Sequence, residues 1–137
     1  RRIGRHFARL FAAAPLAVYA LKHRSADVLM GSTSGGAFTA FSDLILEHGG
    51  VVFGAVLNEQ LQVVHTSART KAERDAMRGS KYVQSDLNTV FPQIRSLLRQ
   101  GTEVMFVGTP CQVDSLKEYL RNEHTENLLL CDFVCHG

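Results

Sequence analysis

A cysteine follows directly on an apolar run and a tight turn in the stretch EVMFVGTPCQVDSL, residues 103–116. Cys111 would lie at the start of the helix that follows, where the helix dipole favours a thiolate. A second cysteine, Cys135, follows another apolar strand in NLLLCDFVCHG, residues 127–137. Because ligands bind beyond the carboxyl ends of strands in a parallel sheet, neighbouring strands would bring both thiols to one crevice. Thiolates are the natural ligands of iron–sulfur clusters, although a cluster normally takes four.

Three interpretations of Cys111 remain open on the residues alone. It is a cluster ligand, a redox-active or nucleophilic thiol, or a packing residue. A thiol enzyme needs a base within reach of the sulfur, and His136 is the candidate base. His136 is also compatible with a metal ligand, an acid or an ordinary loop residue, and the loop residue is the favoured interpretation. Cys131 lies within the apolar strand and is interpreted as a small buried core residue.

Two loops rich in small residues have the composition of anion-binding segments. The stretch GSTSGG, residues 31–36, precedes a helix whose first backbone N–H groups would bind a phosphate or another anion. The stretch RGSKYVQS, residues 78–85, places two cations, Arg78 and Lys81, around a flexible glycine, which suits a phosphorylated or anionic ligand. The plain alternatives are a steric turn for the first loop and a solvated loop for the second.

The first half of the chain predicts a helix followed by a β-hairpin. The run LAVYAL, residues 16–21, is a candidate strand. Apolar residues at helical spacing from residue 37 onward predict a helix that Ser34 could cap and that two glycines at 49 and 50 would end. β-rich runs at 51–57 and 62–68 flank the turn NEQ and predict the hairpin, with His65 as a surface or packing residue.

The second half of the chain alternates helices with strands. Thr70 and Glu73 have the spacing of a capping box at a short polar helix, 70–77. A longer helix is expected to start at Asp86 and to end near residue 100. A buried strand at 103–108, a helix at 111–123 and a strand at 127–134 complete the pattern. This alternation predicts an α/β fold, with a mainly parallel sheet flanked by helices and an additional β-hairpin.

Composition narrows the class of protein. The chain has 137 residues, 45% hydrophobic and 20% charged, which is the balance of a soluble globular domain. The net charge of +2 is too small to argue for nucleic acid, and no apolar run reaches the roughly 18 residues of a membrane span. Three cysteines do not make a disulfide framework, so we expect a reducing, cytoplasmic location.

The two ends of the sequence predict a piece of a longer protein. The first residue is not Met, and the last is Gly137, at the end of the stretch CHG. We expect a basic N-terminal arm at residues 1–15 and an α/β domain at residues 16–137, truncated at both ends. Truncation would expose apolar surface, so self-association into a homo-oligomer is compatible with this interpretation.

Five stretches occur together in a familiar order and spacing: STSGGAFTAF, GGVVFGAVLNEQLQVVH, MRGSKYVQSDL, FVGTPCQVDSLKEYL and LLLCDFVCHG. Over residues 16–137 the chain resembles the coenzyme F-420 hydrogenase/dehydrogenase beta-subunit family. Each stretch alone is a weak signal, and the combination carries the resemblance.

The resemblance implies a flavin- and iron–sulfur-dependent oxidoreductase subunit with an α/β core. Such a subunit passes electrons or hydride between an iron–sulfur chain and a deazaflavin or another acceptor. The resemblance implies FAD, bound by the two small-residue loops and the turn before the first cysteine: Ser32, Thr33, Ser34, Gly35, Gly36, Arg78, Gly79, Ser80, Lys81, Tyr82 and Thr109. It also implies a 4Fe-4S cluster with Cys111 and Cys135 among its ligands and the remaining ligands outside this segment.

The chain departs from the family pattern in two respects. It has no ferredoxin-like CxxCxxC motif, and it stops before the region that would supply further cysteines. The expected partners are therefore a ferredoxin-like domain or another redox subunit and a small-molecule acceptor. Two alternatives remain open: a non-catalytic electron-relay module that docks a partner, and a thiol enzyme that uses Cys111.

Overall fold

The computed structural model describes residues 20, 22–31, 36–79, 85–87 and 89–133. The predicted N-terminal arm and all but one residue of the candidate strand at 16–21 lie outside this part of the chain. Several predicted site residues also lie outside it: Ser32, Thr33, Ser34, Gly35, Ser80, Lys81, Tyr82 and Cys135, together with His136. The roles of these residues stay predictions.

Four strands form one open sheet in the order β2-β1-β3-β4. Their bounds are β1 (Val51–Leu57), β2 (Val63–Ala68), β3 (Val104–Gly108) and β4 (Leu128–Asp132). β1 pairs antiparallel with β2 as a hairpin, whereas β1, β3 and β4 run parallel. The predicted α/β class, with a mainly parallel sheet and an additional hairpin, is confirmed.

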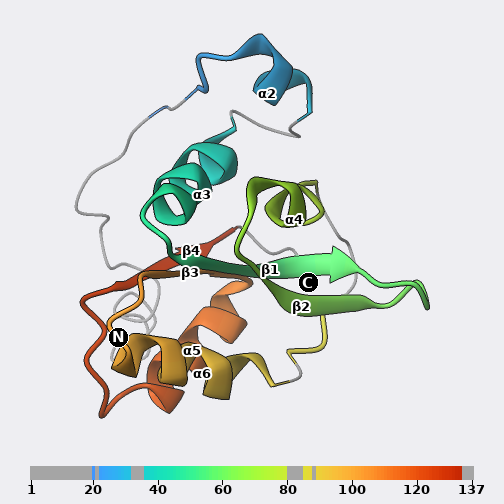
Figure 1. The fold of residues 1–137 in the computed structure, drawn as a ribbon. Coiled ribbons are helices and arrows are strands. Elements are labelled where there is room, and N and C mark those ends of the chain that lie inside the picture. Colours follow the sequence, from blue (N-terminus) through green and yellow to red (C-terminus); the bar gives the residue numbers. More distant parts are fainter. Residues whose placement is uncertain (1–19, 21, 32–35, 80–84, 88, 134–137) are drawn as a thin grey trace, which may run out of the picture.

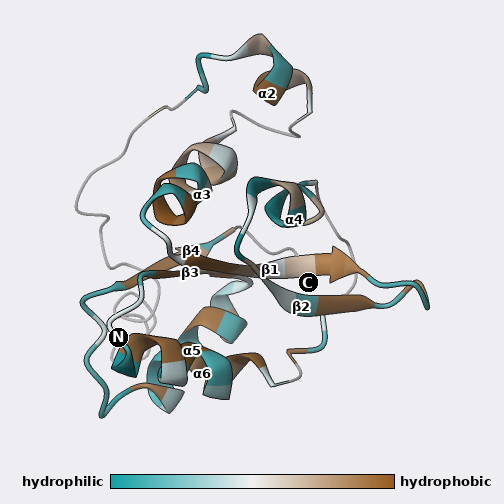
Figure 2. Cartoon of the chain, in the orientation of Figure 1, coloured by the Kyte–Doolittle hydropathy of each residue, from teal (hydrophilic) through white to brown (hydrophobic). Residues whose placement is uncertain are grey.

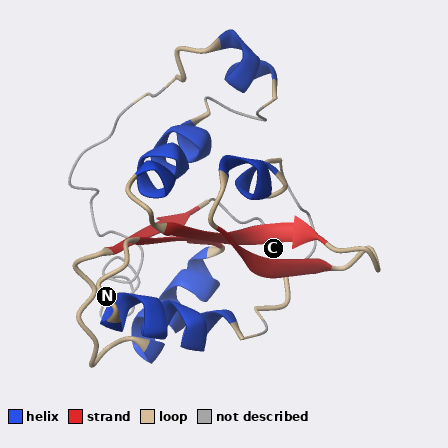
Figure 3. Cartoon of the chain, in the orientation of Figure 1, coloured by secondary structure: helices blue, strands red, loops and turns tan. Residues whose placement is uncertain are grey.

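Helices cover both faces of this sheet (Figure 1; Figure 3). They are α2 (Ala26–Met30), α3 (Ala37–Glu47), α4 (Lys71–Asp75), α5 (Val90–Arg99) and α6 (Pro110–Tyr119). α3 and α4 lie on one face, α5 and α6 lie on the other, and α2 lies beyond α3. The short helix α2 is an element that the sequence pattern did not predict.

Side chains of the central strands alternate between the two faces, as a pleated strand requires. Val51 and Phe53 of β1 join Phe106 of β3 in a buried cluster with α5 and α6. Val52 and Met105 point the other way and pack with side chains of α3. Figure 2 shows the hydrophobic central strands between the two helical layers. Because the faces of the sheet are filled, groups that could do chemistry are expected at the ends of its strands.

The predicted start of the long helix at Asp86 is wrong. The backbone of Asp86 instead pairs with the outer edge of β2, where its N–H donates to the Val63 carbonyl at 2.9 Å and its C=O accepts from the His65 N–H at 2.8 Å. The helix α5 begins only at Val90. Asp86 therefore protects part of a sheet edge, and this pairing cannot be inferred from the helical spacing of the residues after it.

Two other helix ends test the sequence patterns. The capping box of Thr70 and Glu73 is confirmed, because the Thr70 hydroxyl accepts from the Glu73 N–H at 3.2 Å and the Glu73 carboxylate accepts from the Thr70 N–H. The helix predicted for 111–123 spans only Pro110–Tyr119. Beyond it the chain turns, and Glu123 accepts a hydrogen bond from Arg99 of α5 at 3.0 Å.

Candidate functional site

The carboxyl ends of β3 and β4 lie side by side. The two strands pair in parallel, with Val107 opposite Cys131 and Gly108 opposite Asp132. The chain leaves β3 into the turn of Thr109 and Cys111, and it leaves β4 three residues before Cys135. The condition for the two cysteines to share a crevice, that their strands are neighbours, is therefore met, although Cys135 itself lies outside the described residues.

Cys111 is an exposed free thiol in the first turn of α6. Thr109 is the N-cap of this helix, and its hydroxyl accepts from the Gln112 N–H at 3.4 Å. The Gln112 side chain completes a capping box by accepting from the Thr109 N–H at 3.0 Å. The Thr109 oxygen also lies 3.1 Å from the Cys111 sulfur. Since that oxygen already accepts from a backbone N–H, its own proton is available for a hydrogen bond to a Cys111 thiolate.

A series of buried hydrogen bonds connects this turn to the interior of the sheet. His65 of β2 is 4% exposed, and its Nε2 lies 2.8 Å from the Val107 carbonyl of β3. Its Nδ1 lies 2.6 Å from the Ser85 hydroxyl, and the Gln112 side-chain amide donates to the same hydroxyl at 3.0 Å. The prediction of His65 as a surface or packing residue missed this role, since the hydrogen bonds join residues 20 and 27 positions apart.

Burial lowers the pKa of His65 below its ordinary value of 6.5, against a smaller opposite effect of the hydrogen bond to Val107. A neutral ring must donate from Nε2 to the carbonyl, so Nδ1 accepts from the Ser85 O–H. The Ser85 oxygen then accepts from Gln112. In this series of hydrogen bonds, each proton is therefore assigned to one donor atom.

Arg78 connects the two predicted small-residue loops. Its guanidinium donates to the Val28 carbonyl of α2 at 2.9 Å. A Cβ placed on Gly31 would lie 2.6 Å from Nη2 of Arg78, so a larger residue there would require the guanidinium to shift. The start of the stretch RGSKYVQS therefore contacts the start of the stretch GSTSGG, as a shared ligand site would require.

The N-terminus of α3 lies next to this contact. Its N-cap is Gly36, with φ of +79°, and among the described residues no side chain caps the helix. The predicted cap, Ser34, lies outside the described residues. A Cβ on Gly36 would lie 3.2 Å from Val28, the residue whose carbonyl Arg78 holds. α4 and α6, in contrast, have complete capping boxes. α5 also lacks a side-chain cap, but it lies on the other face of the sheet.

The described residues thus connect all three predicted segments. Arg78, at one end of the second loop, contacts the first loop at Val28 and Gly31. Ser85, at the other end of the second loop, contacts Gln112 in the turn that carries Cys111. The two described ends of the segment 78–85 therefore lie at the start of the small-residue loop after α2 and at the carboxyl end of β3.

The described residues do not by themselves form a metal site. Among these residues no group of three or more histidine, cysteine or carboxylate side chains could hold a metal ion. Cys131 is half-buried and packs against the cluster around Met105. Burial, followed by the charge of Asp132, raises the pKa of its thiol. Cys131 therefore suits the core role predicted for it better than a ligand role.

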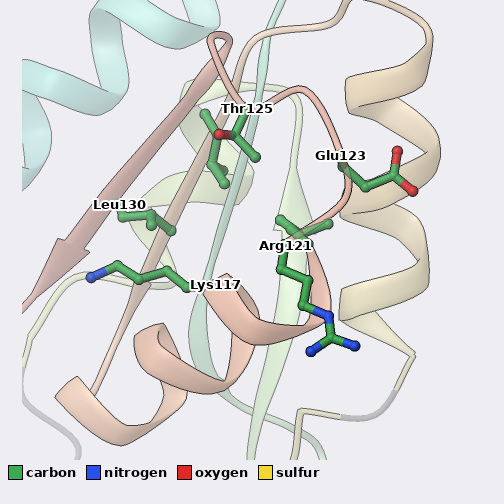
Figure 4. Close-up of a pocket in the computed structure, with 7 residues that line it drawn as sticks. Lys117, Arg121, Glu123, Thr125 and Leu130 are labelled. Carbon is green, nitrogen blue, oxygen red and sulfur yellow. The ribbon is translucent and has the colours of Figure 1, made fainter.

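A separate pocket lies at the opposite end of the sheet, between the last turn of α6 and the start of β4 (Figure 4). It has a volume of about 240 Å³. Its lining consists of Lys117, Leu120, Arg121, Glu123, Thr125, Leu128 and Leu130. None of the predicted site residues lines it, so the chemistry of the strand ends is a better guide to function than this hollow.

Arg74 is a further cation near these loops, and the sequence analysis did not identify it as important. It is 3% exposed and lies between α4 and α3. Its Nη1 donates to the Asp43 carboxylate at 2.7 Å and to the Thr39 carbonyl at 3.2 Å, and also to the Ser42 hydroxyl. Arg74 therefore fixes α4, and with it the start of the second loop, against α3.

Comparisons with known proteins support the fold. No family model matches the chain, and no curated protein matches it. A chain in a xenon-derivatised structure of the F420-reducing NiFe hydrogenase complex from Methanosarcina barkeri is similar, with a TM-score of 0.57 and 20% identity. The match covers 75% of this chain and 38% of that chain. The likeness shows a shared α/β fold, and this chain spans well under half of the length of its neighbour.

The described residues also bear on membrane association. Among them, no helix is long and apolar enough to cross a membrane.

The lowered pKa of His65 predicts a pH dependence of stability. Above its ordinary pKa of 6.5, His65 is neutral in both the folded and the unfolded chain and contributes no pH dependence. As the pH falls below that value, the unfolded chain binds the proton first, so the free energy of unfolding decreases until the folded pKa is passed. Between about pH 6.5 and pH 5, we expect the free energy of unfolding of His65→Gln to decrease less steeply than that of the wild type.

Thermal denaturation at a series of pH values measures this difference. His48→Gln is the matched control, because the His48 side chain is 61% exposed. Parallel curves for the wild type and His65→Gln would contradict the prediction.

Proposed function

We propose that this chain is part of an oxidoreductase subunit that binds FAD at the α3 side of the sheet and passes electrons or hydride to a deazaflavin or another acceptor. The observation that carries the proposal is the contact of Arg78 with Val28 and Gly31, beside the N-terminus of α3, where the N-cap is Gly36. This contact joins two loops whose composition suits a phosphate group. The neighbour from an F420-reducing hydrogenase complex supports the same class of chemistry.

The residues present suit the phosphate part of a flavin dinucleotide. Within the described part of the chain, no side chain accepts from the first N–H groups of α3, and the 11-residue helix has a positive N-terminal dipole end. Arg78 adds a cation with a planar set of donors. Gly36 allows close approach of a ligand to the backbone, because it has no side chain and takes a left-handed conformation.

FAD, when bound, would supply the hydride chemistry. The residues of this chain bind and orient it: Arg78 and the α3 N–H groups hold negative charge, and we propose Lys81 and the hydroxyls of the two loops as further contacts. Thr109 is proposed to contact the cofactor from the carboxyl end of β3. Arg78 would thereby also stabilise negative charge on the bound group.

For the cluster, the described residues alone do not form a binding site. Cys111 is exposed and available as one ligand, and Cys135 is proposed as a second. The remaining ligands would come from outside this segment. A ferredoxin-like domain or another redox subunit is the proposed electron partner, since a cluster that passes electrons needs a donor and an acceptor beside it.

The test is a visible absorption spectrum of the full-length protein, purified without oxygen, together with iron analysis. Flavin bands and a broad iron–sulfur shoulder, both bleached by dithionite, are expected. Turnover of a deazaflavin by that protein would separate an enzyme from a relay module. A protein that stays colourless after reconstitution with FAD, iron and sulfide would overturn the proposal and favour thiol chemistry at Cys111.

A further inference from the structure

A continuous set of hydrogen bonds runs from the interior of the sheet to the turn of Cys111. It starts at the Val107 carbonyl, passes through His65 and Ser85, and reaches Gln112. The Gln112 amide oxygen accepts from the Thr109 N–H at 3.0 Å. We propose that His65 and Ser85 are positioning residues that set the orientation of the Gln112 amide and thereby the shape of the turn from Thr109 to Cys111.

The donor and the acceptor of each hydrogen bond in this series can be assigned. Val107 offers only an acceptor, so the neutral His65 ring donates from Nε2 and accepts at Nδ1. Ser85 therefore donates to the ring, and its oxygen faces the Gln112 NH₂ group. With the NH₂ group held at Ser85, the amide oxygen must face Thr109. A flipped amide would place two donors opposite each other at Thr109 and two acceptors at Ser85.

The surroundings leave little freedom for another arrangement. Gln112 is 4% exposed, and a Cβ on Gly108 would lie 2.9 Å from its Oε1. The His65 ring stacks on Phe106 with a centroid distance of 5.1 Å and an interplanar angle of 19°. The imidazole is thus held in place by an aromatic ring as well as by its two hydrogen bonds.

The chain suits positioning and not proton transfer. The last member of this set of hydrogen bonds, Gln112, is a carboxamide, which neither gains nor loses a proton at ordinary pH. His65 is separated from Cys111 by this amide and by Thr109. The role proposed for His65 rests on the proposed function, in which Thr109 and Cys111 belong to the cofactor site.

Two NMR measurements on the full-length protein test the positioning role, and neither needs a bound cofactor. The first is the tautomer of His65 from its ring nitrogen shifts, which should show a proton on Nε2 only. The second is the hydrogen-exchange rate of the Thr109 amide. In Ser85→Ala, exchange at Thr109 should be about tenfold faster, because the Gln112 amide loses the group that orients it.

Matched variants separate positioning from a general loss of structure. Ser85→Thr keeps the hydroxyl and should restore slow exchange at Thr109. Ser115→Ala removes a hydroxyl on the same helix that donates to the Cys111 carbonyl at 2.8 Å, and it should leave Thr109 unchanged. Amides of Phe53 and Phe106 should exchange at the wild-type rate in every variant.

The inference would be overturned by an Nδ1–H tautomer of His65, or by equal Thr109 exchange in the wild type and Ser85→Ala. Faster exchange throughout the sheet in Ser85→Ala, without rescue by Ser85→Thr, would also overturn it. Failure of the flavin proposal would appear separately, as a colourless reconstituted protein with the Thr109 result intact.

Discussion

Replacing Arg78 with alanine is expected to weaken FAD binding by about ten- to a hundredfold, the effect of losing one charge-assisted hydrogen bond to an anionic group. Arg78 is where the two small-residue loops meet, since its guanidinium holds the Val28 carbonyl and packs on Gly31. The variant loses both the positive charge and the contact that keeps the loops together. Titration of the full-length apoprotein with FAD, followed by flavin fluorescence, measures the affinity.

Two further variants make the Arg78 experiment specific. Arg78→Lys keeps the charge without the planar guanidinium, so its affinity should lie between those of the wild type and Arg78→Ala. Arg69→Ala removes the same charge from an exposed residue that precedes α4, and it should bind FAD like the wild type. Equal affinity of Arg78→Ala and Arg69→Ala would remove Arg78 from the site. Unchanged affinity in a double Arg78→Ala, Lys81→Ala variant would reject the whole loop.

Replacing Arg74 with alanine is expected to lower the free energy of unfolding by about 1.5–3 kcal/mol, because the charge-assisted hydrogen bonds of a buried guanidinium are lost. The Arg74 side chain is 3% exposed, whereas that of its partner Asp43 is 28% exposed. Without Arg74, the Asp43 carboxylate loses its 2.7 Å partner, and the Thr39 carbonyl and Ser42 hydroxyl lose a donor. Urea denaturation of the full-length protein measures the change.

Lys71→Ala is the matched control for Arg74. Lys71 also bridges from α4 to α3, with its Nζ 2.9 Å from Glu47 and 3.7 Å from Asp43, but it is exposed. Exposed ion pairs contribute little, so the loss should be much smaller than for Arg74→Ala. Arg74→Met keeps the apolar stem and should still destabilise, because the charge and donors are gone. A midpoint for Arg74→Met equal to that of the wild type would show that the ion pair contributes no net stability.

Local patterns in the sequence determined much of the architecture. Helical spacing predicted α3 and α6, and β-rich or continuous apolar runs predicted the hairpin β1–β2 and the parallel strands β3 and β4. The capping box of Thr70 and Glu73 was predictable because its two partners are three residues apart. The place of Cys111, after a buried strand and in the first turn of a helix, follows from the same kind of short-range information.

Only the tertiary structure decided which of these residues come together. Asp86 is a residue type that commonly starts a helix, yet its backbone pairs with the outer edge of β2. Arg74 lies in a polar stretch, yet it is buried against a helix about 30 residues earlier. Arg78 reaches Val28 across 50 residues, and His65 reaches Val107 across 42. Periodicity and capping act within a few residues along the chain, whereas these contacts depend on strand order and on the packing of both helical layers, which no local pattern contains.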